Sequence, residues 1–253
     1  MHDLAGKTAV ITGGASGMGR SFAQRIGRAG MNLVLGDIEE PALAATVDEL
    51  TAAGPDAIGV PTDVADEAAM RALAGAATER FGATHVVCLN AGVGGGNGEM
   101  HTLSTEDWAW TLNVNLWGII HGITAFLPAL RDQDDGHVVI TASVAGLTSY
   151  PGMGPYNTTK HAAVAIAETL FAELRDADSR VGVSCLCPGL VMTNIFTSDR
   201  NRPEALQPPG PLIADPMSPE EQARIEGIIE MVTAHATSPD MVADLVHDAV
   251  LAD

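Results

Sequence analysis

The sequence is poor in positive charge and has no long apolar run. Its 253 residues include 13 Lys and Arg against 32 Asp and Glu, which gives a formal net charge of −19. Such a chain repels phosphate backbones and anionic bilayers, so we expect no nucleic-acid partner and no membrane partner. No stretch approaches the roughly 18–20 uncharged apolar residues of a membrane-spanning helix. The first residues lack a signal-peptide core, which favours a cytoplasmic location.

Cysteine is also scarce. Cys88, Cys185 and Cys187 each lie in an apolar run, and the last two are too close in sequence for an easy disulfide. No Cys or His spacing matches a known metal site, and we expect no bound metal. We therefore predict three buried, unreactive thiols in a reducing compartment.

Short apolar runs alternate with longer Ala-rich segments along the whole chain. The runs lack polar alternation, as strands covered on both faces do, and β-α repeats favour a parallel sheet with right-handed crossovers. We predict one α/β domain over 1–253, a Rossmann-type doubly wound parallel sheet with helices on both faces. The predicted strands are Lys7–Thr12, Asn32–Leu35, Ala57–Val60, His85–Leu89, His137–Thr141 and Gly182–Leu186. The predicted helices are 17–30, 40–53, 66–81, 105–131 and 155–176.

The alternation stops at a polar stretch, Ser198–Pro219, which contains six prolines. It is too long for a simple connection, so we interpret residues 194–219 as a mobile substrate loop or lid. A disordered surface insertion is the alternative. Two short helices are expected after it, at Pro219–Ala234 and Pro239–Leu251.

Three glycines, Gly13, Gly17 and Gly19, follow the first predicted strand and open a helix. Glycine lets backbone amides approach a pyrophosphate, and the helix amino terminus adds partial positive charge. Asp37 ends the second strand, where a carboxylate accepts hydrogen bonds from ribose hydroxyls and repels a 2′-phosphate. Ile38 follows it rather than Arg, and Ser16 offers no cation, so the pattern favours NAD over NADP.

Two further motifs lie at predicted strand ends, where ligands bind in doubly wound sheets. Asp63-Val64 follows the third strand and Asn90-Ala91-Gly92 follows the fourth. Each motif alone is equally consistent with ordinary turn chemistry.

A hydroxyl, a phenol and an ammonium group are spaced for proton transfer. Tyr156 and Lys160 are four apart on a predicted helix and share a face, while Ser143 lies 13 residues earlier, past a strand end. A free phenol titrates near about 10. The ammonium, with an oxidised nicotinamide ring, should stabilise the phenolate, so that Tyr156 exchanges a proton with an alcohol or ketone. Ser143 would hold the substrate oxygen.

In this order, TGGASGMG, NAG, NVNLWG, a serine before YNTTK, and PGLVMT resemble the short-chain dehydrogenase/reductase family over nearly all of the chain. The resemblance implies that Asn115 completes a catalytic tetrad and holds a water that links Lys160 to solvent; Asn113 fits the spacing less well. It also implies that Asp63 and Val64 hold the adenine. The full expected cofactor set is Gly13, Ser16, Gly17, Met18, Gly19, Asp37, Ile38, Asp63, Val64, Asn90, Ala91, Gly92, Tyr156, Lys160, Pro188, Gly189, Val191 and Thr193.

The expected substrate pocket is apolar, with no obvious Lys or Arg, which favours a hydrophobic secondary alcohol or ketone. Its expected lining is Val144, Leu147, Met153, Ile195 and Phe196. A NADP-dependent carbonyl reductase, a sugar epimerase or dehydratase, and a non-catalytic nucleotide sensor are the alternatives. Many family members end in a further strand, whereas Met241–Asp253 has a helical pattern. That makes the usual tetramer less certain, and we expect a homodimer, through helices 105–131 and 155–176, or a homotetramer.

Overall fold

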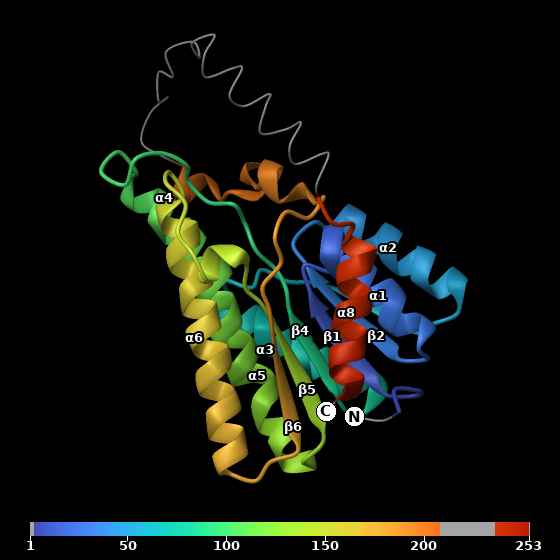
Figure 1. Ribbon diagram of the computed structural model, residues 1–253. Helices are drawn as coiled ribbons and strands as arrows, with labels where there is room; N and C mark the ends of the chain where they lie inside the picture. The colour runs from blue at the N-terminus through green and yellow to red at the C-terminus, as the bar shows by residue number, and fades with distance from the viewer. Residues whose placement is uncertain (1–2, 208–235, 253) are drawn as a thin grey trace.

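A parallel sheet of six strands forms the centre of the molecule (Figure 1). The computed structural model describes residues 3–207 and 236–252. The strand order is β3-β2-β1-β4-β5-β6, and every pairing is parallel. The bounds are β1 Thr8–Thr12, β2 Asn32–Asp37, β3 Ala57–Pro61, β4 Val86–Leu89, β5 Gly136–Thr141 and β6 Val181–Leu186. The predicted doubly wound α/β fold is confirmed, and each predicted strand lies within two residues of its observed bounds.

Helices cover both faces of the sheet, as the unbroken apolar strands require. Every residue of β1, β4 and β5 is buried. One apolar core lies under α1, α2 and α8, and a second lies under α3, α5 and α6. The bounds are α1 Gly17–Arg28, α2 Glu40–Ala53, α3 Glu67–Phe81, α4 Thr105–Leu112, α5 Gly118–Gln133, α6 Gly154–Asp176 and α8 Pro239–Ala252.

The helix predicted over 105–131 is interrupted by one π-helical stretch, Asn113–Trp117, between α4 and α5. Its start matches the sequence pattern. Ser104 Oγ accepts a hydrogen bond from the Asp107 amide, and the Asp107 carboxylate accepts one from the Ser104 amide, which completes a capping box. A π stretch widens the helix locally and often marks a functional position. Here it carries Asn115.

The end of the described chain is helix α8, as the pattern of Met241–Asp253 indicates. It packs on α1, where Ser21 Oγ donates to Asp240 at 2.8 Å and Arg25 Nε donates to Asp244 at 2.7 Å. Within residues 3–207 and 236–252 the sheet has no seventh strand, and β6 forms its edge. The predicted helix Pro219–Ala234 and residues 208–219 of the predicted substrate loop lie outside the described residues.

The prediction for the cysteines is wrong in part. Cys88 is fully buried, and burial raises the pKa of its thiol to about 12. Cys185, however, is exposed, and Cys187 is half-buried, with the two sulfurs 3.8 Å apart. Both lie in or just after β6, one of the two edge strands of the described sheet.

Two further observations concern a membrane span and a metal site. None of the helices in the described ranges is both long and apolar enough to cross a bilayer. Within those same ranges no three His, Cys, Asp or Glu side chains gather as metal ligands would.

Candidate active site

The glycine turn between β1 and α1 is too tight for side chains. Gly13 and Gly17 have positive φ values, 65° and 52°. A β-carbon added at Gly19 would lie 2.0 Å from the carbonyl oxygen of Gly13, so only glycine fits there. Ser16 is the N-cap of α1 and makes no side-chain capping bond, which leaves the first-turn amides directed at the carboxyl end of the sheet. This cradle suits a pyrophosphate.

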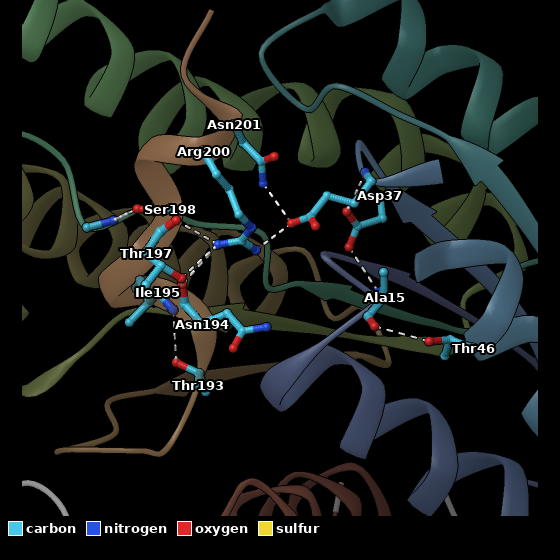
Figure 2. A network of polar contacts seen from close by, with 12 residues as sticks. Ala15, Asp37, Thr46, Thr193, Asn194, Ile195, Thr197, Ser198, Arg200 and Asn201 are labelled. Atoms are coloured by element: carbon cyan, nitrogen blue, oxygen red, sulfur yellow. Dashed lines mark hydrogen bonds and ion pairs between the residues drawn. The ribbon is translucent and has the colours of Figure 1, made fainter. Parts of the chain in front are cut away.

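Asp37 ends β2 beside that turn. One carboxylate oxygen accepts the Ala15 amide at 2.9 Å and the other accepts the Glu39 amide at 3.0 Å. The side chain is therefore held in one orientation next to the glycine turn (Figure 2), where we expect a ribose to lie. Ile38, the next residue, is exposed and carries no charge.

Asn90 contacts the glycine turn itself. Its Nδ2 donates to the carbonyl of Thr12 at 3.1 Å, and its backbone amide donates to Thr12 Oγ1 at 3.0 Å. Thr12 Oγ1 also accepts the Ala91 amide at 3.1 Å. Thr12 was not singled out from the sequence, although it stands directly before the glycines. Together these contacts join the ends of β1 and β4, the strands between which the order of the sheet reverses.

Three expected catalytic side chains lie together where β5 ends and α6 begins: Ser143, Tyr156 and Lys160. The Ser143 hydroxyl is close enough to Tyr156 to lower the pKa of its phenol, against the larger effect of burial. Lys160 Nζ lies 5.6 Å from the centroid of the Tyr156 ring and donates to the carbonyl of Thr141 at 2.9 Å. Ser143 is anchored in turn, since its Oγ accepts the Ala145 amide at 3.1 Å. The expected face-sharing of Tyr156 and Lys160 is thus present in the structure.

Burial dominates the electrostatics of this group. It raises the pKa of the Tyr156 phenol, and the hydrogen bond from Ser143 opposes part of that rise. Burial also lowers the pKa of Lys160 to about 8. Burial therefore disfavours the charged form of each group, although Lys160 with a pKa of about 8 stays mostly protonated at neutral pH. The raised pKa of the phenol differs from our expectation that the ammonium would lower it. A further positive charge near the phenol is needed to make it a base at neutral pH.

Asn115 lies near this group but its amide is fully used by the fold. Oδ1 accepts the Val93 amide at 2.8 Å, while Nδ2 donates to the Val93 carbonyl at 2.9 Å and to Thr159 Oγ1 at 3.3 Å. A β-carbon on Gly92 would lie 3.3 Å from Asn115 Oδ1 and 3.7 Å from Lys160 Nζ. Asn115 therefore joins the π-helical stretch to the segment after β4, beside Lys160.

The other expected adenine and nicotinamide residues lie beyond the carboxyl ends of the strands. Asp63 Oδ1 accepts the Ala65 amide at 2.9 Å, and Val64 is buried against Gly118 of α5. The Pro188 carbonyl accepts the Val144 amide at 2.9 Å. Among the remaining expected residues of this set, Met18 packs on the first core and Val191 is buried. Thr193 contacts Gly17, whereas a β-carbon added at Gly189 would meet nothing within 4 Å.

The expected substrate residues form a rim rather than a closed pocket in the described chain. Leu147 and Phe196 are 65% and 64% exposed. Val144, Met153 and Ile195 are half-buried. Two Arg side chains follow Ile195 and Phe196 in the chain, and both are ion-paired: Arg200 pairs with Glu39, and Arg202 pairs with Asp107 at 2.7 Å. These pairs join residues far apart in sequence, which is why the pattern did not reveal them.

A surface groove of about 580 Å³ lies elsewhere, at the amino ends of the strands between α1 and α2. It is lined by Arg28, Met31, Glu49, Leu50 and Asp56 among others, and by none of the side chains above. The candidate active site is defined by side-chain chemistry and not by that groove.

Comparison with known proteins agrees with the fold and the order of the motifs. The family model described as short chain dehydrogenase matches residues 7–204. The chain belongs to the short-chain dehydrogenase/reductase family and is an oxidoreductase of that family. A solved short chain dehydrogenase/reductase from Burkholderia phymatum, in complex with NAD, is 45% identical with a TM-score of 0.91; the match covers 99% of this chain and 87% of that one.

Two curated relatives extend the comparison. A CLA biosynthesis dehydrogenase/reductase of Lactiplantibacillus plantarum is 30% identical over 255 residues, which cover 99% of this chain and 86% of the relative. A 1-deoxy-11-beta-hydroxypentalenate dehydrogenase of Streptomyces avermitilis is 39% identical over 206 residues, which cover 79% and 75%. Both names describe dehydrogenases.

Proposed function

We propose that this protein is a NAD-dependent oxidoreductase that interconverts a hydrophobic secondary alcohol and the corresponding ketone, with Tyr156 as the acid/base. The convergence of Ser143, Tyr156 and Lys160 at the carboxyl end of the sheet carries the proposal. The glycine cradle and Asp37 fit a dinucleotide that has a free 2′-hydroxyl, and the related Burkholderia phymatum protein was solved with NAD.

The residues divide the chemistry between proton transfer and positioning. A bound nicotinamide dinucleotide accepts or supplies the hydride. The Tyr156 phenolic oxygen takes the alcohol proton during oxidation and returns it during reduction. Ser143 hydrogen-bonds to the substrate oxygen and stabilises charge that develops there. Lys160, fixed by Thr141, places a cationic group beside the Tyr156 ring and favours its phenolate when a second positive charge is near.

An apolar substrate suits the side chains around these groups. Leu147, Phe196 and Met192 are large apolar residues that stay exposed in the segments flanking Ser143 and following β6. Exposed apolar groups of this kind gain free energy when a hydrophobic ligand covers them. Arg200 and Arg202 are both ion-paired, so neither offers an uncompensated charge to an anionic substrate.

A substrate panel tests the proposal. The purified protein is incubated with NAD or NADP and aliphatic, aromatic and cyclic secondary alcohols, and the reduced cofactor is followed by absorbance. We expect turnover with NAD and an apolar alcohol. Turnover with NADP alone would identify a NADP-dependent carbonyl reductase instead. Dinucleotide binding without turnover of any alcohol or ketone would favour the non-catalytic nucleotide sensor.

The same proposal includes self-association through the helices around α5 and α6. Trp117 and Phe171 are 48% and 53% exposed on these elements, which is unusual for side chains so large. Light scattering on the eluting protein distinguishes a homodimer or homotetramer from a single chain.

A further inference from the structure

The segment that follows β6 crosses the carboxyl ends of the central strands. We call Thr193–Arg202 the strap; most of it is the 3₁₀ segment Asn194–Asn201. It belongs to the stretch that the sequence suggests as a substrate loop. Figure 2 shows it facing Asp37 and Ala15 across the site. Its contacts follow the path that a dinucleotide would take from the glycine turn to the ribose carboxylate.

The near end and the middle of the strap rest on two loops of the cofactor site. A β-carbon on Gly17 would lie 3.1 Å from Thr193 Cβ, so Thr193 packs directly on the glycine turn. Ser198 is buried and its Oγ accepts the Gly94 amide at 3.0 Å. The strap is thus fixed to the loops after β1 and β4.

The far end is fastened to the loop after β2 by one carboxylate. Glu39 accepts hydrogen bonds from Arg200 Nη2 and from Asn201 Nδ2, the latter at 2.8 Å. Glu39 is two residues beyond Asp37, which accepts its backbone amide. One residue therefore connects the expected ribose carboxylate, through its backbone, to the strap, through its side chain.

Arg200 is built as a rigid connector. Its Nη1 donates to the Thr197 carbonyl at 2.8 Å and to Thr197 Oγ1 at 3.1 Å, both within the strap. Its Nη2 is left to bind Glu39. The planar guanidinium fixes the two directions relative to each other, so Glu39 cannot move without pulling on the strap. The neighbouring Arg202, at the same end of the strap, is paired separately with Asp107.

We propose that Glu39 is a positioning residue that fastens the strap over the dinucleotide site and slows release of the dinucleotide. The inference rests on the proposed function, because it takes NAD as the ligand under the strap. Release requires the strap to move off the glycine turn, and that motion separates Glu39 from Arg200 and Asn201. Exposed ion pairs contribute modestly and charge-assisted hydrogen bonds somewhat more, so loss of Glu39's charge should speed release by about three- to tenfold.

The test measures NADH release by stopped-flow fluorescence, with excess NAD to displace it. Glu39→Gln, Arg200→Gln, the double variant and Arg200→Lys are compared with the wild type. Asp56→Asn is the matched control. It removes a similar exposed ion pair, Arg80–Asp56 at 2.6 Å, at the amino ends of the strands. Thermal unfolding of each variant without cofactor separates loss of fastening from loss of fold.

We expect faster release in Glu39→Gln and Arg200→Gln, a double variant no faster than either, and an intermediate Arg200→Lys. Non-additivity of this kind shows that the two side chains act as a pair. Concentrated salt screens the Glu39–Arg200 pair, so the ratio of variant to wild-type release rates should fall towards one.

Four results would overturn the proposal. If Glu39→Gln releases NADH at the wild-type rate, the strap is not fastened there, while dinucleotide binding still stands. Equal acceleration by Asp56→Asn, or additive effects of the two strap variants, would show that the pairing is not responsible. If the wild type binds no NADH, the proposed function fails and the role of Glu39 fails with it.

Discussion

Lys160 Nζ lies 5.6 Å from the centre of the Tyr156 ring, yet its hydrogen bond goes to the carbonyl of Thr141, 2.9 Å away. The strand thus holds the cation above the phenol rather than letting the two polar atoms pair. This arrangement keeps the phenolic oxygen available to a substrate. It also means that Lys160 acts on Tyr156 through its charge, and that charge depends on pH because burial lowers the pKa of Lys160 to about 8.

Tyr156→Phe should remove proton transfer while leaving dinucleotide binding intact. The ring and its packing remain, but the phenolic oxygen is lost. General acid–base groups contribute roughly 10²- to 10⁴-fold, and we expect kcat to fall by that range. The measurement is steady-state turnover together with NADH affinity by fluorescence. A variant that keeps wild-type turnover would exclude Tyr156 as the acid/base.

Lys160→Met should abolish activity and raise stability, by an amount that depends on pH. The folded pKa of Lys160 is about 8, below the ordinary value of 10.5, so the unfolded chain binds more protons between these values. Wild-type stability therefore rises with pH across that window, and the buried ammonium is costly below it. We expect Lys160→Met to be inactive. Its melting temperature should exceed that of the wild type at about pH 7, and the excess should be smaller at about pH 9.5. A difference that stays constant with pH would show that Lys160 is not desolvated.

Much of this architecture could be predicted because it depends on local sequence. Strands buried on both faces are apolar throughout, and the capping box at Ser104 and Asp107 lies within one turn. The spacing of Tyr156 and Lys160 is a helical repeat, which fixes their shared face without knowledge of the rest of the chain.

The features that escaped prediction depend on tertiary contacts. Asn115, in the π-helical stretch, bonds to Val93, 22 residues away. Glu39 meets Arg200 across 161 residues, and no local pattern marks either partner. Exposure of Cys185 follows from the place of β6 at the edge of the described sheet, which its apolar sequence does not reveal.

The two asparagines of NVNLWG should differ sharply in their effect on stability. Asn115→Ala would leave both polar backbone groups of Val93 without their present partner in a buried place. Unsatisfied buried groups cost about 1–3 kcal/mol each, so loss of the partner of both groups should lower the free energy of unfolding by about 2–6 kcal/mol. Asn113→Ala, at a half-buried position, is the control and should change it by less than about 0.5–1 kcal/mol. Urea denaturation measures both, and similar losses would contradict this assignment.

Gly19→Ala should disrupt the cofactor turn, since the added β-carbon would lie 2.0 Å from the Gly13 carbonyl oxygen. Backbone contacts this short must relax by displacement of the turn, and we expect NADH affinity to fall at least about tenfold. Gly75→Ala in α3 is the matched substitution, because its β-carbon meets nothing within 4 Å. It should stabilise the helix by about 0.5–1 kcal/mol and leave NADH binding unchanged. Equal NADH affinity in the two variants would rule out a dinucleotide at this turn.

Asp37→Asn should weaken the preference for NAD over NADP. The substitution removes a negative charge that would repel a 2′-phosphate, and an amide cannot accept both the Ala15 and the Glu39 backbone amides as the carboxylate does. Relief of like-charge repulsion should raise the ratio of kcat/KM for NADP to that for NAD by at least about tenfold, with most of the change in KM. Parallel kinetics with the two cofactors measure this ratio, and Asp56→Asn serves again as the charge-matched control. Because Asp37 also holds the Glu39 backbone, the same variant should release NADH faster. An unchanged cofactor ratio with faster release would mean that Asp37 supports the strap and does not select the ribose.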